Sequence, residues 1–197
     1  MRGILAGFQS DKKARAVMAL AFLGIRPAEI LGLRWEDIQR DGINVQRGMW
    51  KGIITPGKTG SRFVPIGPMM WGILEEHRIA TREMNVTGYV FENSIGKALN
   101  TDGLNALTAR VIRPVLKTLG YEWKTLYAGR RGGVTEMRRH ADPQTVAFIM
   151  GHSPEVENSN YLKAVEQDKR DVALLFDAAL SANERQLRDR NEGSDAN

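Results

Sequence analysis

Arg26 is placed where a side chain can act on an anionic group. It lies between Ile25 and Pro27, where a short helix is predicted to begin, because proline is tolerated in the first helical turn. A cation gains nothing from the dipole at that end of a helix. A bound anion explains the arginine, since free N–H groups and a guanidinium can share one phosphate. The alternative is a salt bridge with a neighbour such as Glu29.

Lys58 is the second candidate. It lies in the turn Thr55-Pro-Gly-Lys-Thr-Gly-Ser-Arg62. This turn is not a phosphate-binding P-loop, because the glycine spacing differs and a strand, not a helix, is predicted to follow. Lys58 is either an exposed lysine in a turn or a lysine that a hairpin carries to a ligand.

Three further side chains follow in the second half of the chain. In Tyr127-Ala-Gly-Arg130-Arg131-Gly-Gly, two arginines beside three glycines indicate a close approach of the backbone to something anionic, or else a loop with two surface charges. His152 follows an apolar helix and is either structural or an acid–base group. Tyr161, nine residues later, either packs its ring or acts as a nucleophile.

The composition is that of a globular protein with an excess of basic residues. The 197 residues include 28 Lys and Arg, 23 Asp and Glu and no cysteine, with a formal net charge of +5. The charge favours a polyanionic partner. The missing cysteines exclude disulfides and thiolate metal sites, and they fit a reducing cytosol. No uncharged stretch approaches the about 20 residues of a membrane span, and no secretory signal opens the chain.

Periodicity predicts an α+β fold: a mainly helical domain with a small antiparallel β-sheet. The first ten residues carry little pattern. A helix begins after Asp11 and ends at Gly24, and a short one starts at Pro27. The segment 43–66 is predicted to form the sheet, with a Gly-rich turn near 56–61. The residues predicted to be buried in these two helices are Ala14, Val17, Met18, Ala21, Phe22, Ile30, Leu31 and Leu33.

The rest of the chain is predicted to be helical. One helix has Met70, Ile73, Leu74 and His77 on its buried side. A second runs from Leu104 to Leu119, is capped by Asp102 and is kinked by Pro114. The start Asp142-Pro143 leads to a helix ending near Met150, and Ser153-Pro154 starts another. The last helix, Asp171 to Leu180, has an apolar stripe of Val172, Leu175, Phe176 and Ala179. Residues 183–197 are expected to be a disordered polar tail.

In their order, these segments resemble the catalytic domain of a tyrosine recombinase of the phage-integrase type. The resemblance spans about residues 10 to 165. The first motif is an arginine box that begins Leu23-Gly-Ile-Arg26-Pro-Ala-Glu29 and ends Trp35-Glu-Asp37-Ile38. The second is the hairpin Lys58-Thr-Gly-Ser-Arg-Phe-Val-Pro-Ile66. The third is the box Tyr127-x-x-Arg130-Arg131, and the fourth is Met150-Gly-His152-Ser followed by Tyr161.

The resemblance implies DNA cleavage by transesterification. Tyr161 would attack a phosphodiester to give a 3′-phosphotyrosine link and a free 5′-hydroxyl, and a second 5′-hydroxyl would reverse the reaction. Arg26 and Arg130 would clamp the phosphate oxygens, Lys58 would be the general acid and His152 a hydrogen-bond donor. The implied catalytic residues are Arg26, Lys58, Tyr127, Arg130, His152 and Tyr161, and the implied DNA contacts are Arg26, Arg62, Arg130 and Arg131. No metal or other cofactor is implied.

Two departures from the family pattern are notable. Tyr127 stands where the family usually has histidine, and tyrosine is a poor proton acceptor near neutral pH. Residues 1–182 are expected to form the catalytic domain without the usual amino-terminal core-binding domain, so that the chain is either a fragment or a minimal member.

The function expected from the resemblance is that of a site-specific recombinase for integration or excision of a mobile element. Its expected partner is double-stranded DNA, with self-association on DNA through the carboxy-terminal helix. Its expected location is the cytoplasm, at the nucleoid when it binds DNA. The alternatives are a catalytically impaired DNA-binding module, a type IB topoisomerase-like enzyme, and a basic helical protein that binds RNA or acidic proteins.

Overall fold

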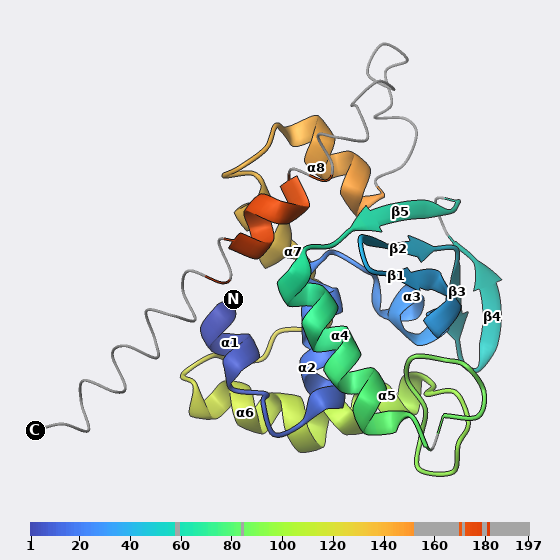
Figure 1. The fold of residues 1–197 in the computed structure, drawn as a ribbon. Coiled ribbons are helices and arrows are strands. Elements are labelled where there is room, and N and C mark those ends of the chain that lie inside the picture. The colour runs from blue at the N-terminus through green and yellow to red at the C-terminus, as the bar shows by residue number, and fades with distance from the viewer. Residues whose placement is uncertain (58–59, 84, 152–169, 171, 179–180, 182–197) are drawn as a thin grey trace, which may run out of the picture.

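A computed structural model describes residues 1–57, 60–83, 85–151, 170, 172–178 and 181 (Figure 1). The predicted α+β class is confirmed, because helices surround a small antiparallel sheet. The α-helices are α1 (Arg2–Ala6), α2 (Lys12–Phe22), α3 (Pro27–Gly32), α4 (Pro68–Thr81), α5 (Thr101–Leu107), α6 (Arg113–Thr118), α7 (Leu126–Met137) and α8 (Pro143–Met150). In the described part of the chain, no helix is both long and apolar enough to cross a membrane.

Helix α2 is the centre of the core. Asp11 caps it by accepting a hydrogen bond from the backbone N–H of Ala14 at 2.8 Å, and Gly24 ends it with a φ of +83°, as predicted. The single buried face predicted for this helix is wrong, because every residue of 14–22 is buried. The reason is that α2 packs against both α4 and α7, so that most of its circumference is covered, and the buried Arg15 pairs with Glu76 at 2.9 Å.

The first ten residues are more ordered than their pattern predicts. They form α1 and a following turn, in which the side chains of Leu5 and Phe8 are fully buried. Met1, Ile4, Leu5 and Phe8 have helical spacing, but a helix of five residues is not stable alone and depends on packing against the rest of the domain, including α2.

The predicted single sheet is two sheets. Strands β1 (Ile38–Gln39), β2 (Gly42–Val45) and β5 (Arg62–Pro65) form one antiparallel sheet in the order β1-β2-β5, with Ile43 opposite Val64. Strands β3 (Arg47–Trp50) and β4 (Ile53–Pro56) form a separate antiparallel hairpin. A 3-10 turn, η1 (Trp35–Asp37), precedes β1.

The β3–β4 hairpin differs in burial from the three-stranded sheet. Ile43 and Val64 in the sheet are fully buried, whereas Trp50, Ile53 and Ile54 near the hairpin turn are 57%, 68% and 44% exposed. Apolar residues in a strand therefore did not predict core positions here, because burial is confined to the middle of β3, while Trp50 and all of β4 are exposed.

The prediction that Asp102 caps the next helix is wrong. Asn100 is the cap, and its side chain accepts from the backbone N–H of Gly103 at 2.9 Å, so that Asp102 lies in the first turn. The irregularity expected at Pro114 is a π-helical turn, η2 (Thr108–Ile112), between α5 and α6. Proline has no N–H for the carbonyl four residues earlier, and the turn before it rearranges.

The last helices agree with the predictions in part. Asp142 caps α8 as predicted, accepting from Gln144 and Thr145. Among the helical residues 172–178, Val172 and Phe176 are buried in the chain's own core, as part of the predicted stripe, but Leu175 is 48% exposed. Asp177, in the same segment, accepts from the backbone N–H of Met70 at 3.1 Å. Ala179 of the predicted stripe lies outside the described residues. The helix predicted after Ser153 and the tail 183–197 lie outside the described residues.

A candidate phosphate clamp of buried arginines

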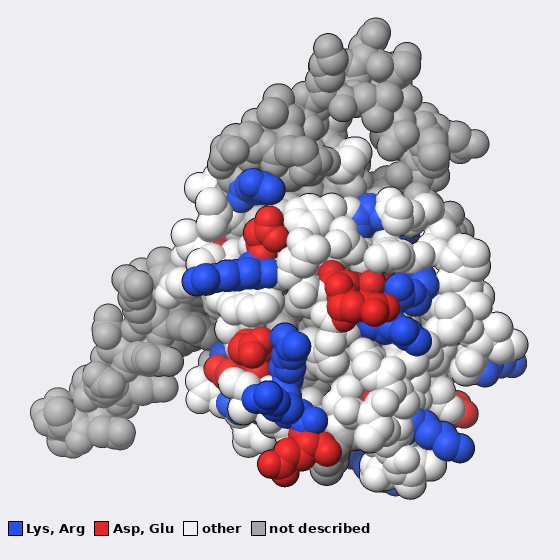
Figure 2. Space-filling model, turned by 45° about the vertical axis from the view of Figure 1, so that its right-hand side comes forward, with Lys and Arg blue, Asp and Glu red and all other residues white. Residues whose placement is uncertain are grey.

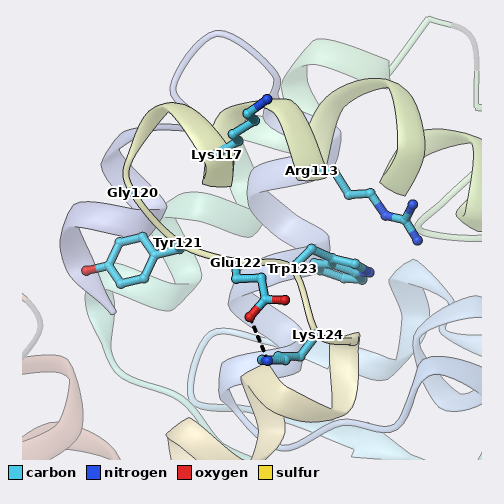
Figure 3. Close-up of a pocket in the computed structure, with 7 residues that line it drawn as sticks. All are labelled: Arg113, Lys117, Gly120, Tyr121, Glu122, Trp123 and Lys124. Carbon is cyan, nitrogen blue, oxygen red and sulfur yellow. Dashed lines mark ion pairs between the residues drawn. The ribbon is translucent and has the colours of Figure 1, made fainter.

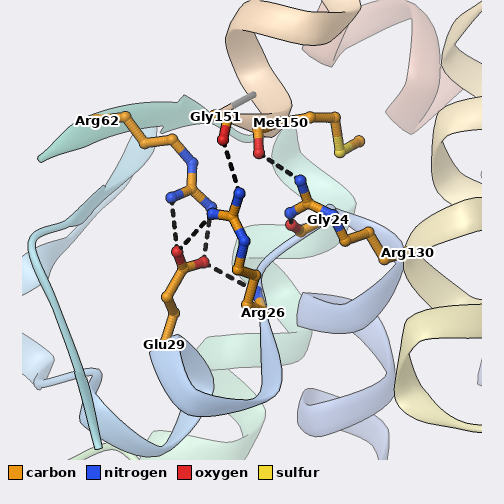
Figure 4. A network of polar contacts seen from close by, with 7 residues as sticks. All are labelled: Gly24, Arg26, Glu29, Arg62, Arg130, Met150 and Gly151. Atoms are coloured by element: carbon orange, nitrogen blue, oxygen red, sulfur yellow. Dashed lines mark hydrogen bonds and ion pairs between the residues drawn. The ribbon is translucent and has the colours of Figure 1, made fainter. Parts of the chain in front are cut away.

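Arg26 lies at the N-terminal end of α3 and is held by a buried carboxylate (Figure 4). Glu29, 3% exposed, accepts from the backbone N–H of Arg26 at 2.9 Å and from its Nη1 at 2.8 Å. The Nη2 of Arg26 donates to the carbonyl oxygen of Gly151 at 2.7 Å. The salt-bridge alternative for Arg26 is therefore present, and the same bonds hold the guanidinium at the start of α3.

A second arginine binds the same carboxylate. Arg62, on β5, donates through Nη1 and Nη2 to the two oxygens of Glu29 at 2.9 and 2.7 Å. Its side chain is 6% exposed. Burial alone raises the pKa of the Glu29 carboxyl, but the bonds and charge of Arg62, together with the bonds from Arg26, outweigh it and hold the pKa below its usual value.

Arg130 completes the cluster from α7. It is buried, and it donates to the carbonyl oxygens of Gly24 and, at 2.5 Å, of Met150. Burial, followed by the charges of Arg26 and Arg62, lowers the pKa of Arg130 to about 10. The lowered pKa means that the surroundings disfavour the positive charge of Arg130. A bound anion would stabilise that charge.

The cluster brings together charges that are far apart in the sequence. Arg26 and Arg62 both bond to the Glu29 carboxylate, whereas Arg130 beside them bonds to the carbonyls of Gly24 and Met150 (Figure 4). The charges of Arg26, Arg62 and Glu29 all act on Arg130. The surplus of positive charge, with planar N–H donors and a helix N-terminus beside it, is the chemistry that binds a phosphate group.

Two of the three glycines around Arg130, Gly129 and Gly133, serve packing between helices and not the approach of a ligand, which corrects the interpretation drawn from the sequence. A Cβ on the third, Gly132, would meet nothing within 4 Å. The segment is the helix α7 and not a loop. A Cβ on Gly133 would lie 1.8 Å from the carbonyl oxygen of Phe22, and one on Gly129 would lie 3.2 Å from Cβ of Ala21. Both glycines let α7 approach α2 closely enough to bury Arg130.

The remaining predicted residues have different positions. Tyr127 lies in the first turn of α7, one turn before Arg130, and is 50% exposed. Arg131 is exposed. Lys58, His152 and Tyr161 lie outside the described residues. The DNA contacts predicted for Arg62 and Arg131 stay predictions, although the bonds of Arg62 are directed into the protein.

A basic and aromatic hollow near the start of α7 was not identified from the sequence. Its volume is about 750 Å³, and Figure 3 shows side chains of α6 and of the loop before α7 around it. Lys124 pairs with Glu122 at 2.6 Å, and Tyr121 is 51% exposed. The lining residues are Arg113, Lys117, Gly120, Tyr121, Glu122, Trp123 and Lys124. The signal in the sequence was the basic and aromatic composition of 117–124.

Charge elsewhere on the surface is mixed. On the face shown in Figure 2, lysines and arginines are interspersed with aspartates and glutamates. Within the described ranges, no group of three or more His, Asp or Glu residues is arranged to hold a metal ion. The excess of positive charge in the arginine cluster therefore indicates an anionic ligand more specifically than the net charge of the whole chain does.

The architecture is that of the catalytic domain of tyrosine recombinases. The Tn1549 transposon integrase bound to transposon right-end DNA superposes with a TM-score of 0.65 at 21% identity, covering 85% of this chain and 60% of that one. For the XerA recombinase the TM-score is 0.64 at 19% identity, covering 85% of this chain and 59% of that one. For the lambda integrase catalytic core it is 0.51 at 16% identity, covering 76% and 85%.

A sequence comparison agrees with the fold. The chain is 28% identical over 171 residues to a tyrosine recombinase XerC-like protein of Caldanaerobacter subterraneus subsp. tengcongensis, a match over 72% of this chain and 43% of that protein. No family model matches the sequence. The chain therefore has the fold of tyrosine recombinase catalytic domains and is similar in sequence to a tyrosine recombinase XerC-like protein. It spans less than half the length of this curated relative.

Proposed function

We propose that the chain is the catalytic domain of a site-specific DNA recombinase, which cleaves and rejoins DNA through a 3′-phosphotyrosine intermediate. The observation that carries this proposal is the pair Arg26 and Arg130, which the fold brings to the two consecutive carbonyls at the end of α8. Each bond uses one N–H, and a guanidinium has further N–H donors for a phosphate. The Tn1549 integrase, which shares the fold, is solved in complex with DNA, and double-stranded DNA is the partner proposed here.

In the proposed reaction the phenolic oxygen of Tyr161 loses its proton to solvent water and forms a bond to phosphorus. The bond between phosphorus and the 5′-oxygen breaks, and Lys58 gives its proton to that oxygen. Arg26 and Arg130 stabilise the charge that develops on the two non-bridging oxygens, and His152 donates a hydrogen bond to one of them. The guanidiniums supply the positive charge, so that the proposal includes no metal.

Tyr127 is the residue whose role differs most from the family pattern. Its half-exposed position at the start of α7, one turn before Arg130, lets its hydroxyl donate to a bound phosphate. It does not accept a proton readily at neutral pH. We therefore assign it a contact to phosphate and leave proton transfer to Lys58.

The hollow lined by Lys117 and Lys124 extends the proposed DNA surface. It ends three residues before Tyr127, so that it adjoins the arginine cluster along the chain. Lysine and arginine beside exposed aromatic rings are suited to a phosphate backbone and its sugars. The proposed path of the DNA runs from the cluster over this hollow.

Other parts of the proposal concern the whole protein. Residues 1–182 are the proposed catalytic domain, and the proposed location is the cytoplasm, with the protein at the nucleoid when it binds DNA. The proposed role is the integration or excision of a mobile element. Leu174 and Leu175, which are 52% and 48% exposed on the helical residues 172–178, give the carboxy-terminal helix an apolar side for self-association on DNA.

A covalent-adduct assay tests the proposed chemistry. The chain is mixed with a nicked duplex from which the 5′-hydroxyl product diffuses away, and an SDS-resistant protein–DNA adduct is expected. Tyr161→Phe should abolish the adduct and leave DNA binding within about twofold, because only the hydroxyl is removed. An adduct of unchanged yield in that variant would assign the nucleophile elsewhere.

A second substrate tests the general acid. Lys58→Ala should cleave poorly on the normal duplex and should be rescued when sulfur replaces the 5′-bridging oxygen, since a thiolate leaves without a proton. Lys51→Ala, a lysine in the turn of the β3–β4 hairpin, is the matched control and should behave like the parent on both substrates. Equal loss on both substrates in Lys58→Ala would move the acid role to another residue.

The alternative functions give different results in the same experiments. The presence of Tyr127 in place of histidine favours a catalytically impaired DNA-binding module as the second candidate. That module would bind DNA and form no adduct. A type IB topoisomerase-like enzyme would form the adduct and also relax a supercoiled plasmid that carries no recombination site.

A further inference from the structure

Arg62 makes contacts that differ from those of a DNA-binding side chain. Both of its terminal nitrogens bond to Glu29, one to each carboxylate oxygen, and its side chain is 6% exposed. A planar guanidinium and a carboxylate paired in this way have one geometry, because two parallel bonds fix their relative orientation. The pair therefore fixes where the Glu29 carboxylate lies.

Glu29 in turn fixes Arg26. The Oε1 atom of Glu29 accepts from Nη1 of Arg26 at 2.8 Å and from Nη1 of Arg62 at 2.9 Å. The Oε2 atom accepts from the backbone N–H of Arg26 at 2.9 Å. If Arg62 were absent, a carboxylate that is 3% exposed would keep one of its two cationic partners and could turn about its own side chain.

Arg62 also contacts the end of α8. A Cβ on Gly151 would lie 2.6 Å from Cδ and 2.8 Å from Nε of Arg62. Gly151 has a φ of +60°, and its carbonyl oxygen accepts from Nη2 of Arg26 at 2.7 Å. The side chain of Arg62 thus lies between β5, the Glu29 carboxylate and the residue that binds Arg26 from the other side (Figure 4).

We infer that Arg62 is a positioning residue of the recombinase reaction: through Glu29 and Gly151 it holds the Arg26 guanidinium in the orientation that binds the reacting phosphate. This inference rests on the proposed function and replaces the DNA contact first predicted for Arg62. It gives Arg62 no contact with the phosphate. The positive charge of Arg62 balances the Glu29 carboxylate. Its side chain also holds Glu29 and Gly151, the two residues that bind Arg26, in place.

Cleavage kinetics test the inference. Arg62→Met keeps most of the length of the side chain and removes the guanidinium that binds both Glu29 oxygens. At saturating nicked duplex this variant should slow adduct formation by about 10- to 100-fold. The dissociation constant for DNA should change by less than about threefold, because no DNA contact is lost. Arg62→Lys, which keeps the charge as a single point, should recover part of the rate. A tenfold weaker binding with an unchanged rate would show a direct DNA contact instead and would overturn the inference.

A matched control separates positioning from stability. Arg47 on β3 binds the buried Asp37 at 2.7 Å, and Asp37 is 1% exposed, so that Arg47→Met breaks a similar pair outside the cluster. Both methionine variants should lower the Tm, and the rates are compared at a temperature where both are folded by circular dichroism. Only Arg62→Met should slow cleavage. If the two variants have the same rate, Arg62 is merely structural.

Two further measurements keep the test independent of folding and of the proposed function. In the Glu29→Gln background, Arg62→Met should change the rate by less than about twofold, because Arg62 acts through that carboxylate. In the free protein, the ¹⁵N NMR signal of Arg26 Nε should show a rigid side chain in the parent and a mobile one in Arg62→Met. If the Arg26 side chain is equally rigid in both proteins, the inference is overturned, whether or not the parent forms an adduct. If the parent forms no adduct but the NMR change is observed, only the proposed function is overturned.

Discussion

The side chain of Arg62 lies across Gly151 so closely that a Cβ atom on this glycine would be 2.6 Å from Cδ of the arginine. Gly151 ends α8 with a φ of +60°, a conformation that favours glycine. Two separate constraints, one from the backbone and one from a neighbour, therefore require glycine at this position.

Gly151→Ala should lower the free energy of unfolding by about 2 kcal/mol, from backbone strain and from displacement of Arg62. The matched control is Gly52→Ala, where φ is +80° and nothing lies within 4 Å of the added Cβ, so that only the strain of about 1 kcal/mol applies. Urea denaturation measures both. Equal losses in the two variants would show that Arg62 moves aside without a penalty.

Neighbouring glycines in α7 should respond in opposite directions. Gly133→Ala puts a Cβ 1.8 Å from the Phe22 carbonyl oxygen and should destabilise the protein by about 3 kcal/mol, because α7 must move away from α2. Gly132→Ala adds a Cβ to open space and should stabilise the helix by about 0.5–1 kcal/mol. Thermal unfolding of the two variants decides this, and a stable Gly133→Ala would contradict the packing described for α7.

The adjacent arginines of α7 should differ in catalysis. Arg130→Lys keeps the charge but replaces two donor nitrogens with one, which cannot span the two carbonyls that Arg130 binds while it also binds a phosphate. It should reduce cleavage at saturating DNA by about 10²–10³-fold. Arg131→Lys, at an exposed position, should cleave at the parent rate. Adduct formation is the measurement, and parental cleavage by Arg130→Lys would remove this residue from the clamp.

His77 should make the protein less stable below neutral pH. Its Nε2–H donates to the Val90 carbonyl at 2.9 Å, and its buried Nδ1 has no hydrogen-bond partner among the described residues. Burial is the main cause that lowers the pKa of His77, with the bond to Val90 opposing it, Lys13 adding to it and Asp11 opposing it. The unfolded chain therefore binds the proton more readily, and the free energy of unfolding falls as the pH drops below about 6.5.

Denaturant titrations between pH 7 and 5.5 test this effect. The window lies above the range in which Glu29 titrates, since the pKa of that carboxyl is lowered. His77→Gln should flatten the pH dependence. His140→Gln, which removes a histidine 3.7 Å from Glu136 near the surface, should leave the part due to His77 unchanged. A parental slope in His77→Gln would assign the pH dependence to other groups.

The hollow beside α6 should contribute to DNA affinity and not to the chemical step. Lys117→Ala should weaken binding at low salt, reduce the slope of log affinity against log salt by about 1, and leave the rate at saturating DNA unchanged. Lys97→Ala, an exposed lysine that does not line the hollow, is the control for loss of one charge. Identical salt slopes in the two variants would place the DNA elsewhere.

The sequence by itself determined the features that depend on near neighbours in the chain. Asp11 and Asp142 start their helices because their carboxylates bind N–H groups two or three residues away, and Pro27 starts α3 because its φ is fixed. The ordered motifs around Arg26 and Arg130 also predicted the class of protein. These inferences needed only local geometry and the spacing of residue types.

Only the tertiary structure decided which distant groups meet. Arg62 is 33 residues from Glu29, and the resemblance, which implies a DNA contact for Arg62, gave no indication of this buried ion pair. The glycines of α7 looked like part of an anion site, and Gly133 proved to face the backbone of Phe22. The physical reason is that a buried charge needs a partner of opposite sign, and close helix packing needs space; both are set by the other elements that fold around the residue and not by its neighbours in the chain.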